Sequence, residues 1–136
     1  MRDFALGILT PTGEGFSGRV QELFLRTTSG EVGIMANHTD YLAGIEPCVA
    51  KLTDADGTKR IAFCGGGFLS VLKGEASLVV DEFAFSEVLS VESIQAERDT
   101  LAADLAACDA KNQPERVAYL KTALNRAETK LRAAER

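Results

Sequence analysis

All twelve glycines of this 136-residue chain lie before residue 75, and two of its three prolines lie in the same stretch. Glycine is common in turns and bulges and unfavourable inside helices, so a chain that loses its glycines part-way changes its type of secondary structure there. We therefore expect a β-sandwich domain over residues 1–86, followed by a helical hairpin over residues 87–136. The predicted fold class is α+β, mainly β.

Short apolar stretches recur between turn signals throughout the first part. The sequence Asp54-Ala55-Asp56-Gly57 separates two of them and contains an Asp-Gly pair, which is a strong hairpin signal. Lys73-Gly74-Glu75 separates another two. No long helical pattern interrupts these stretches, which argues against a parallel β-α-β arrangement and favours an antiparallel β-sandwich.

The apolar residues take up a helical period from about residue 90. One helix is expected over about 90–109, with Ser90 as its N-cap, and a second over 114–134, with Pro114 in its first turn. The second helix carries one narrow apolar stripe, suited to a neighbouring helix, made of Val117, Leu120, Leu124, Ala127 and Leu131. The hairpin is rich in alanine, which buries little area, so we expect it to hold to the sandwich weakly.

The composition excludes several classes of protein. The chain is acidic, with a net charge of -5, whereas nucleic-acid binding relies on Lys and Arg, so no nucleic acid is expected as a partner. No apolar run approaches the roughly 20 residues that span a bilayer. The start Met1-Arg2-Asp3 lacks the positive charge of a signal peptide, so a cytosolic protein is expected. Cys48, Cys64 and Cys108 have no Cys-x-x-Cys spacing and are expected to be reduced, packed thiols.

The second helix is basic although the chain is acidic. Residues 115–136 carry a net charge of +3, which leaves -8 on residues 1–114. A basic helix of this kind is either simply solvated or directed at an acidic partner surface, and the sequence leaves both open. No internal partner for the charge is expected, and Asp81-Glu82 is interpreted as a solvated strand end. The basic residues of the helix are Arg116, Lys121, Arg126, Lys130 and Arg132.

The sequence predicts no catalytic site. A catalytic role for His38, the only histidine, would require Asp40 and a nucleophile such as Ser29 or Thr39, and a structural or interface role is favoured. No second histidine and no cluster of cysteines supply metal ligands, so no metal is expected. Gly65-Gly66-Gly67 lacks the Lys-Ser/Thr of a phosphate loop and indicates a close backbone approach or a bulge.

A series of short motifs follows in a specific order along the chain. They are Leu9-Thr10-Pro11, Phe16-Ser17-Gly18-Arg19-Val20, Gly30-Glu31-Val32-Gly33-Ile34, Asn37-His38-Thr39-Asp40-Tyr41-Leu42, Gly65-Gly66-Gly67-Phe68-Leu69 and Asp81-Glu82. In these motifs the chain resembles the epsilon subunits of bacterial F-type ATP synthases over essentially its whole length. The resemblance implies an N-terminal β-sandwich and a C-terminal helical hairpin, as expected from the residues themselves.

The resemblance further implies a non-catalytic rotor subunit of the central stalk. In that family the sandwich binds the gamma subunit, which implies contacts at His38 and Tyr41. It also rests on the ring of c subunits, which implies a contact at Ser29, Gly30 and Glu31. The C-terminal helices fold down on the sandwich or extend among the alpha and beta subunits and inhibit ATP hydrolysis, which implies inhibitory contacts by the five basic residues named above. Such a protein takes part in ATP synthesis and proton transport, as a peripheral membrane protein on the cytoplasmic face of the cell membrane.

Some members of that family bind ATP in the folded-down state. Their motif at the first helix begins Ile/Leu-Asp-x-x-Arg-Ala, whereas this chain has Leu89-Ser90-Val91-Glu92-Ser93-Ile94, without the aspartate or the arginine. Arg126 matches one basic position of the nucleotide site, Lys130 substitutes at another, and Tyr119 stands where an arginine is expected. No cofactor is therefore expected. The alternatives are a free-standing module that presents its helices to another protein partner, and an enzyme with an unrecognised site.

Overall fold

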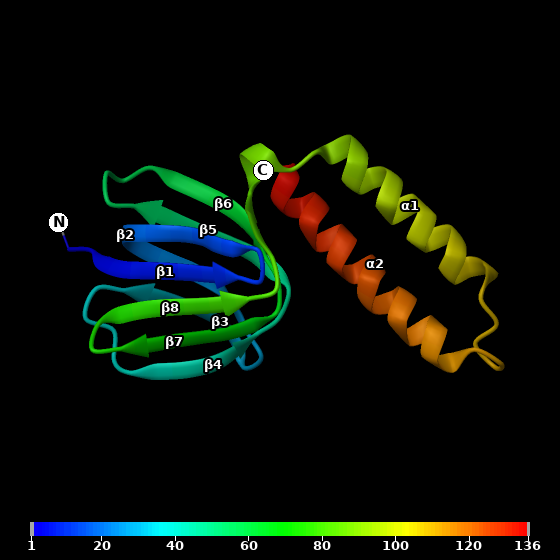
Figure 1. Ribbon diagram of the computed structural model, residues 1–136, viewed down its shortest axis with the longest axis horizontal. Coiled ribbons are helices and arrows are strands. Elements are labelled where there is room, and N and C mark those ends of the chain that lie inside the picture. Colours follow the sequence, from blue (N-terminus) through cyan, green and yellow to red (C-terminus); the bar gives the residue numbers. More distant parts are fainter. Residues whose placement is uncertain (1, 136) are drawn as a thin grey trace.

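The protein is described here by a computed structural model of residues 2–135, in which nine strands form one body and two α-helices form a hairpin beside it (Figure 1). The elements in chain order are β1 (Phe4–Thr10), β2 (Gly13–Thr27), β3 (Gly30–Met35), β4 (Tyr41–Ile45), β5 (Cys48–Asp54), β6 (Lys59–Cys64), β7 (Gly67–Leu72), β8 (Glu75–Val80), β9 (Phe83–Phe85), the short 3-10 helix η1 (Ser86–Val88), α1 (Val91–Ala107) and α2 (Pro114–Ala134).

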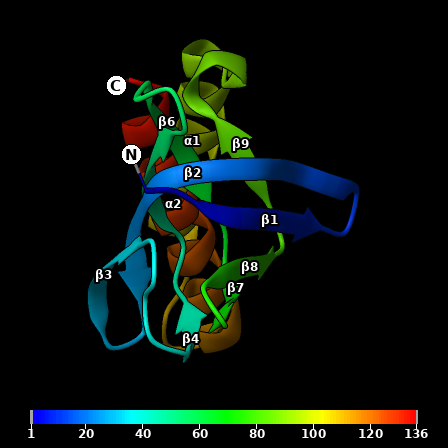
Figure 2. The same cartoon turned by 90° about the vertical axis from the view of Figure 1, so that its left-hand side faces the viewer.

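The strands form a β-sandwich, which confirms the predicted fold class. Neighbouring strands are hydrogen-bonded in the order β1-β8-β7-β4-β2-β5-β6-β9, and β3 pairs with β2. The 15-residue strand β2 connects the two layers, because its first half pairs with β1 and its second half with β3 and β5. Figure 2 shows β1 and β2 projecting together to one side and β3 lying at the other.

One pairing differs from the all-antiparallel arrangement that was predicted. β1 lies parallel to β8, with Leu6 opposite Ala76 and Leu9 opposite Val79, and every other strand pairing within residues 2–135 is antiparallel. Parallel strands need a long connection, which is often a helix. Here most of the sandwich sequence lies between β1 and β8, so the intervening strands form that connection. A pairing over this distance in sequence leaves no local signal.

Both predicted hairpins are confirmed. In the first, the backbone N–H of Gly57 donates to the carbonyl of Asp54 at 2.9 Å, and Gly57 has a φ of 91°. In the second, Lys73 and Gly74 have φ angles of 51° and 77°, which is the pair of left-handed residues that a tight two-residue hairpin requires.

The hydrophobic core lies entirely between the strands. Each of β1 to β8 contributes buried residues to it, and no helix residue does. Cys48 and Cys64 lie opposite each other on β5 and β6 and belong to this core, which confirms the packing role expected for them. Cys108, just after α1, is half-buried.

α2 lies against the sandwich, and α1 lies against α2 (Figure 1). Both predicted helix starts are confirmed: the Ser90 hydroxyl accepts a hydrogen bond from the Ser93 backbone N–H at 3.3 Å, and Pro114 is the first residue of α2. Ile94 is the only buried residue of α1, whereas α2 buries Leu120, Ala127, Thr129, Leu131 and Ala133. Neither helix, within the residues that the structure describes, has the length and hydropathy needed to span a membrane.

Candidate functional site

The link between β8 and β9 lies directly against the glycine triplet. The Gly65 backbone N–H donates to the Glu82 carbonyl at 2.7 Å, and the Asp81 N–H donates to the Gly66 carbonyl at 3.0 Å. A Cβ atom on Gly65 would collide with the Asp81 carboxylate, and one on Gly67 would collide with the Val79 carbonyl. The triplet therefore marks a close backbone approach, as the sequence predicted.

Two acidic residues of this link bind two basic residues of α2. The Arg126 guanidinium contacts both Asp81 oxygens, at 3.0 Å and 3.3 Å, and donates to Glu82 Oε1 at 2.8 Å. Lys130 Nζ lies 2.9 Å from Glu82 Oε2. We call these four residues the ion cluster. The expectations that Asp81-Glu82 is a solvated strand end and that the basic helix has no internal partner are therefore both wrong.

The ion cluster is built over a buried aromatic ring. The Phe63 side chain is fully buried, and its ring centre lies 5.1 Å from Arg126 Cζ and 5.3 Å from Lys130 Nζ. Arg126 and Lys130 are four residues apart, so they lie on one face of α2 and can cover the same ring. Phe63 lies on β6 but outside the sandwich core, and the helix covers it.

The cluster shifts the protonation equilibria of Glu82 and Arg126. Burial acts to raise the pKa of Glu82, but the hydrogen bonds from Arg126 and Lys130 outweigh it, and the pKa of Glu82 is lowered. Burial acts to lower the pKa of Arg126, and the hydrogen bonds to Asp81 and Glu82 outweigh it, so the pKa of Arg126 is raised. Glu82 and Arg126 therefore stabilise the charged forms of each other.

The other basic residues predicted to be inhibitory are not part of this cluster. Arg116 and Lys121 are exposed on α2. Arg132 is exposed as well, and its guanidinium donates to the Thr129 hydroxyl at 3.2 Å. The helix thus holds two of its five predicted contact residues against the sandwich and leaves three accessible.

The predicted c-ring contact lies in the tight turn from β2 to β3. Gly30 has a φ of 124°, and the Thr27 hydroxyl donates to its carbonyl at 2.8 Å. The Ser29 backbone N–H in turn donates to the Thr27 hydroxyl at 3.1 Å. This turn holds Ser29 and Glu31 exposed.

The structure brings the two predicted gamma-contact residues together. The rings of His38 and Tyr41 meet edge to face, with centres 5.7 Å apart. His38 Nδ1 lies 2.7 Å from the Thr39 carbonyl, while the Asp40 carboxylate accepts from the Lys73 backbone N–H at 2.9 Å. His38 and Asp40 are thus engaged with different groups and do not form a catalytic pair.

An exposed apolar surface lies on strands β1, β8, β7 and β4, and the sequence analysis did not predict it. We call it the apolar face; its large side chains are Leu9 (54% exposed), Leu42 (73%), Phe68 (63%) and Val79 (50%). Val79 lies opposite Phe68 in one strand pair and opposite Leu9 in another, so three of the four are direct neighbours. The signal was present in the sequence from Phe68 to Leu72, because residues 68, 69, 71 and 72 are apolar and a strand with one solvated face should alternate.

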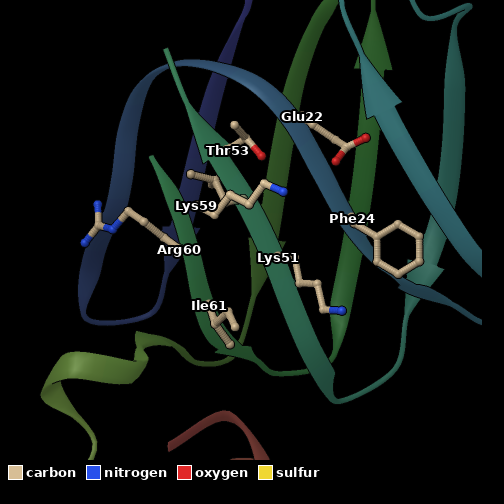
Figure 3. A pocket seen from close by; sticks show the side chains of 8 residues that line it. Glu22, Phe24, Lys51, Thr53, Lys59, Arg60 and Ile61 are labelled. Atoms are coloured by element: carbon tan, nitrogen blue, oxygen red, sulfur yellow. The ribbon is translucent and has the colours of Figure 1, made fainter. Parts of the chain in front are cut away.

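A groove of about 400 Å³ lies on the outer face of β2, β5 and β6 (Figure 3). Phe24 and Ile61 form its apolar part, and Lys51 and Lys59 lie exposed on it. Arg60 is turned away to the Phe85 ring, whose centre is 3.6 Å from its guanidinium carbon. The groove contains none of the predicted site residues, and residues 2–135 hold no group of three or more His, Cys, Asp or Glu arranged to bind a metal ion.

Comparison with known proteins identifies the family. The model of the ATP synthase delta/epsilon chain beta-sandwich domain matches residues 3–86, which is more than half of the chain. The chain belongs to the ATP synthase delta/epsilon family. This epsilon-type chain is 31% identical over 123 residues to the ATP synthase epsilon chain of Cutibacterium acnes, covering 89% of this chain and 84% of that one. It is 32% identical over 94 residues to the epsilon chain of Clostridium acetobutylicum, covering 69% and 71%.

The same fold occurs in solved ATP synthases. A chain of the Euglena gracilis mitochondrial ATP synthase, in a structure of OSCP, F1 and c-ring, matches with a TM-score of 0.83 at 20% identity, over 100% of this chain and 83% of that one. A chain from the central stalk and c-ring of the Tetrahymena thermophila enzyme matches with a TM-score of 0.54 at 16% identity, over 89% and 96%. These likenesses show the fold, and the bacterial relatives show that the resemblance stated from the motifs is correct. The epsilon chain is a non-catalytic subunit, which confirms that the chain is not an enzyme.

Proposed function

We propose that this chain is a central-stalk rotor subunit of a proton-translocating F-type ATP synthase. It couples the c-subunit ring to the catalytic head through the gamma subunit, and its C-terminal helices inhibit ATP hydrolysis by the alpha and beta subunits. The observation that carries the proposal is the match to a bacterial epsilon chain over 123 residues, which is longer than the sandwich and therefore includes part of the hairpin.

The apolar face supports the gamma subunit as a partner. Large exposed apolar patches on a folded protein mark interaction sites, because water leaves them favourably when a partner binds. Leu42 of this face lies on β4, the strand that begins with Tyr41, so the predicted gamma contact at His38 and Tyr41 lies at the end of a strand that carries the apolar face, although Tyr41 itself points to the core side of the sheet. We assign the apolar face, His38 and Tyr41 to the gamma subunit.

The turn at Ser29, Gly30 and Glu31 is assigned to the c-ring. Its fixed geometry and its exposed Glu31 are suited to a contact that must transmit force without deforming. In the assembled enzyme the chain would lie at the cytoplasmic face of the cell membrane as a peripheral subunit.

The nucleotide role is not part of this proposal. Arg126, which matches a basic position of the family's nucleotide site, and Lys130, which substitutes at another, are neutralised by Asp81 and Glu82. An anion would have to displace both carboxylates to reach them. We therefore infer that the hairpin is held on the sandwich without ATP.

The proposal is tested on the reconstituted ATP synthase in membrane vesicles. Omission of the chain should abolish ATP-driven proton pumping while leaving hydrolysis by the head intact, and a chain ending at residue 87 should restore pumping and raise hydrolysis above that of the full chain. A chain that does not copurify with the other subunits would instead support a free-standing binding module. Equal hydrolysis with the full and shortened chains would contradict the inhibitory role.

A further inference from the structure

We propose that Asp81 and Glu82 form an ionic latch that competes with acidic partner surfaces for Arg126 and Lys130, so that α2 binds either the sandwich or a partner. The latch itself depends only on contacts within this chain. Its effect on ATP hydrolysis rests on the function proposed above, and the experiments below separate the two.

The ion cluster is the whole ionic connection between the hairpin and the strands in the described part of the chain. Three ion pairs join α2 to the sandwich, and each of them ends on Asp81 or Glu82. The other ion pairs join β2 to residues just outside the strands, β6 to η1, or neighbours within α1. A single acidic dipeptide thus controls the electrostatic attachment of both helices.

The cluster leaves little of its basic groups for a second partner. Both terminal nitrogens of Arg126 are bonded to carboxylates, and Lys130 retains 17% of its side-chain exposure beside Glu82. The two positive and two negative charges cancel, so the docked helix attracts an acidic surface only through its remaining basic residues. A partner that binds Arg126 or Lys130 must first displace Asp81 or Glu82.

The apolar part of the attachment is small. On the sandwich side Phe63 lies under the cluster, and the buried apolar residues of α2 are Leu120, Ala127, Leu131 and Ala133. Two of these four are alanines, which contribute little buried area. α1 packs on α2 rather than on the strands, so it moves with α2. The ion cluster therefore adds to the burial of Phe63 in holding the hairpin in place.

The latch is tested first on the full isolated chain. Spin labels on Cys108, beside the hairpin loop, and on an introduced Thr12→Cys in the β1–β2 turn report the position of the hairpin, while Cys48 and Cys64 are buried. The variant Asp81→Asn with Glu82→Gln removes the charges at nearly constant volume. It should broaden the label distance and raise the undocked fraction severalfold, and high salt should do the same to the parent chain but not to the variant.

The matched control is Glu14→Gln with Glu75→Gln, which removes two exposed acids of the sandwich that form no ion pair in residues 2–135. This control should keep the parental label distance. An unchanged distance in the Asp81→Asn, Glu82→Gln variant would overturn the latch.

The competition is tested in the reconstituted enzyme. Neutralising the acids (Asp81→Asn with Glu82→Gln) releases α2 with its basic residues intact and should lower ATP hydrolysis severalfold. Neutralising the bases (Arg126→Gln with Lys130→Gln) also releases α2 but removes its partner contacts, and should raise hydrolysis. Opposite effects on hydrolysis, with the same effect on the label distance, are what competition requires. Equal effects of the two variants would overturn it.

The chain without its hairpin separates this inference from the proposed function. If its removal leaves hydrolysis unchanged, the inhibitory role fails, and the label distances alone decide on the latch. If its removal raises hydrolysis while the acid-neutralised variant hydrolyses ATP at the parental rate, the inhibitory role stands and the competition fails.

Discussion

Gly65 lies so close to the Asp81 carboxylate that any larger residue at position 65 would occupy the place of its oxygen. The Arg126 Nη2 atom also lies within 3.1 Å of where that Cβ atom would be. The absence of a side chain at position 65 is therefore a condition for the ion cluster, and a glycine in the link between β6 and β7 affects how a helix some sixty residues further along the chain is attached.

Gly65→Ala should consequently loosen the cluster and destabilise the protein. The added methyl group pushes Asp81 away from Arg126, and overpacking of this kind costs about 1–3 kcal/mol. Urea unfolding followed by circular dichroism measures the change. The matched control is Gly7→Ala on β1, where a Cβ atom meets nothing within 4 Å, and its free energy of unfolding should stay within about 0.5 kcal/mol of the parent. Equal stabilities of the two variants would contradict this account of Gly65.

The features that could be predicted from the sequence are the ones with local causes. The glycine distribution, the Asp-Gly hairpin, the Ser90 cap and Pro114 each act within a few residues, and the structure confirms each of them. The parallel pairing of β1 with β8 depends on contacts between distant strands, and no local pattern indicates it.

The ion cluster shows the same limit at the candidate site. Asp81 and Arg126 are 45 positions apart in the sequence. The net charge of a segment does not show which of its residues form ion pairs with residues elsewhere in the chain. A partial signal was available, because Arg126 and Lys130 have the spacing of one helix face and Asp81-Glu82 is an acidic pair at a strand end. The spacing indicates a two-charge contact, but the partner is determined by the tertiary fold.

Residues 1–86 should fold without the hairpin. Every residue of the hydrophobic core lies in β1 to β8, so removal of the helices leaves that core complete. It does expose Phe63, whose burial contributes about 1.5–3 kcal/mol. The shortened chain should therefore unfold cooperatively in urea at a lower midpoint than the full chain. Loss of cooperative unfolding would show that the sandwich is not an independent domain.

The contribution of Glu82 to stability should depend on pH. Its pKa is lowered in the folded protein from a usual value of 4.5, so the contribution is fully present above that value and is lost as the pH falls through the lower, folded-state pKa. The difference in free energy of unfolding between the parent and Glu82→Gln should thus be constant near neutral pH and shrink in acid below about pH 4.5. Glu14→Gln, at an exposed acid outside the cluster, is the control variant. If the difference in free energy of unfolding between the parent and Glu82→Gln instead grew in acid, the role of Glu82 in the ion cluster would be contradicted.

Phe68→Glu should weaken binding to the gamma subunit without unfolding the sandwich. Phe68 is 63% exposed, so the substitution removes little packing in the isolated chain. In a complex it would bury a charge in an apolar contact, which is costly unless the charge is paired. Copurification with gamma should fall while the urea midpoint stays near the parental value. Val88→Glu, at a residue 75% exposed but on η1 and away from the apolar face, is the matched control and should leave copurification unchanged.

Glu31→Lys should weaken the coupling of proton flow to ATP synthesis. Glu31 is exposed at the start of β3, and the turn before it is held by the Thr27 hydroxyl, so the substitution reverses a charge without disturbing the backbone. If Glu31 attracts the c-ring, reversing its charge replaces that attraction with a repulsion. The reversal should therefore lower the affinity of the chain for the c-ring more than removal of the charge does. Proton-driven ATP synthesis by reconstituted vesicles should therefore decrease in the order parent, Glu31→Gln, Glu31→Lys.

Glu14→Lys is the matched charge reversal, because Figure 2 shows the β1–β2 turn on the opposite side of the sandwich from β3. Synthesis that falls equally with Glu31→Lys and Glu14→Lys would reflect net charge alone, and Glu31 would then not belong to the c-ring contact.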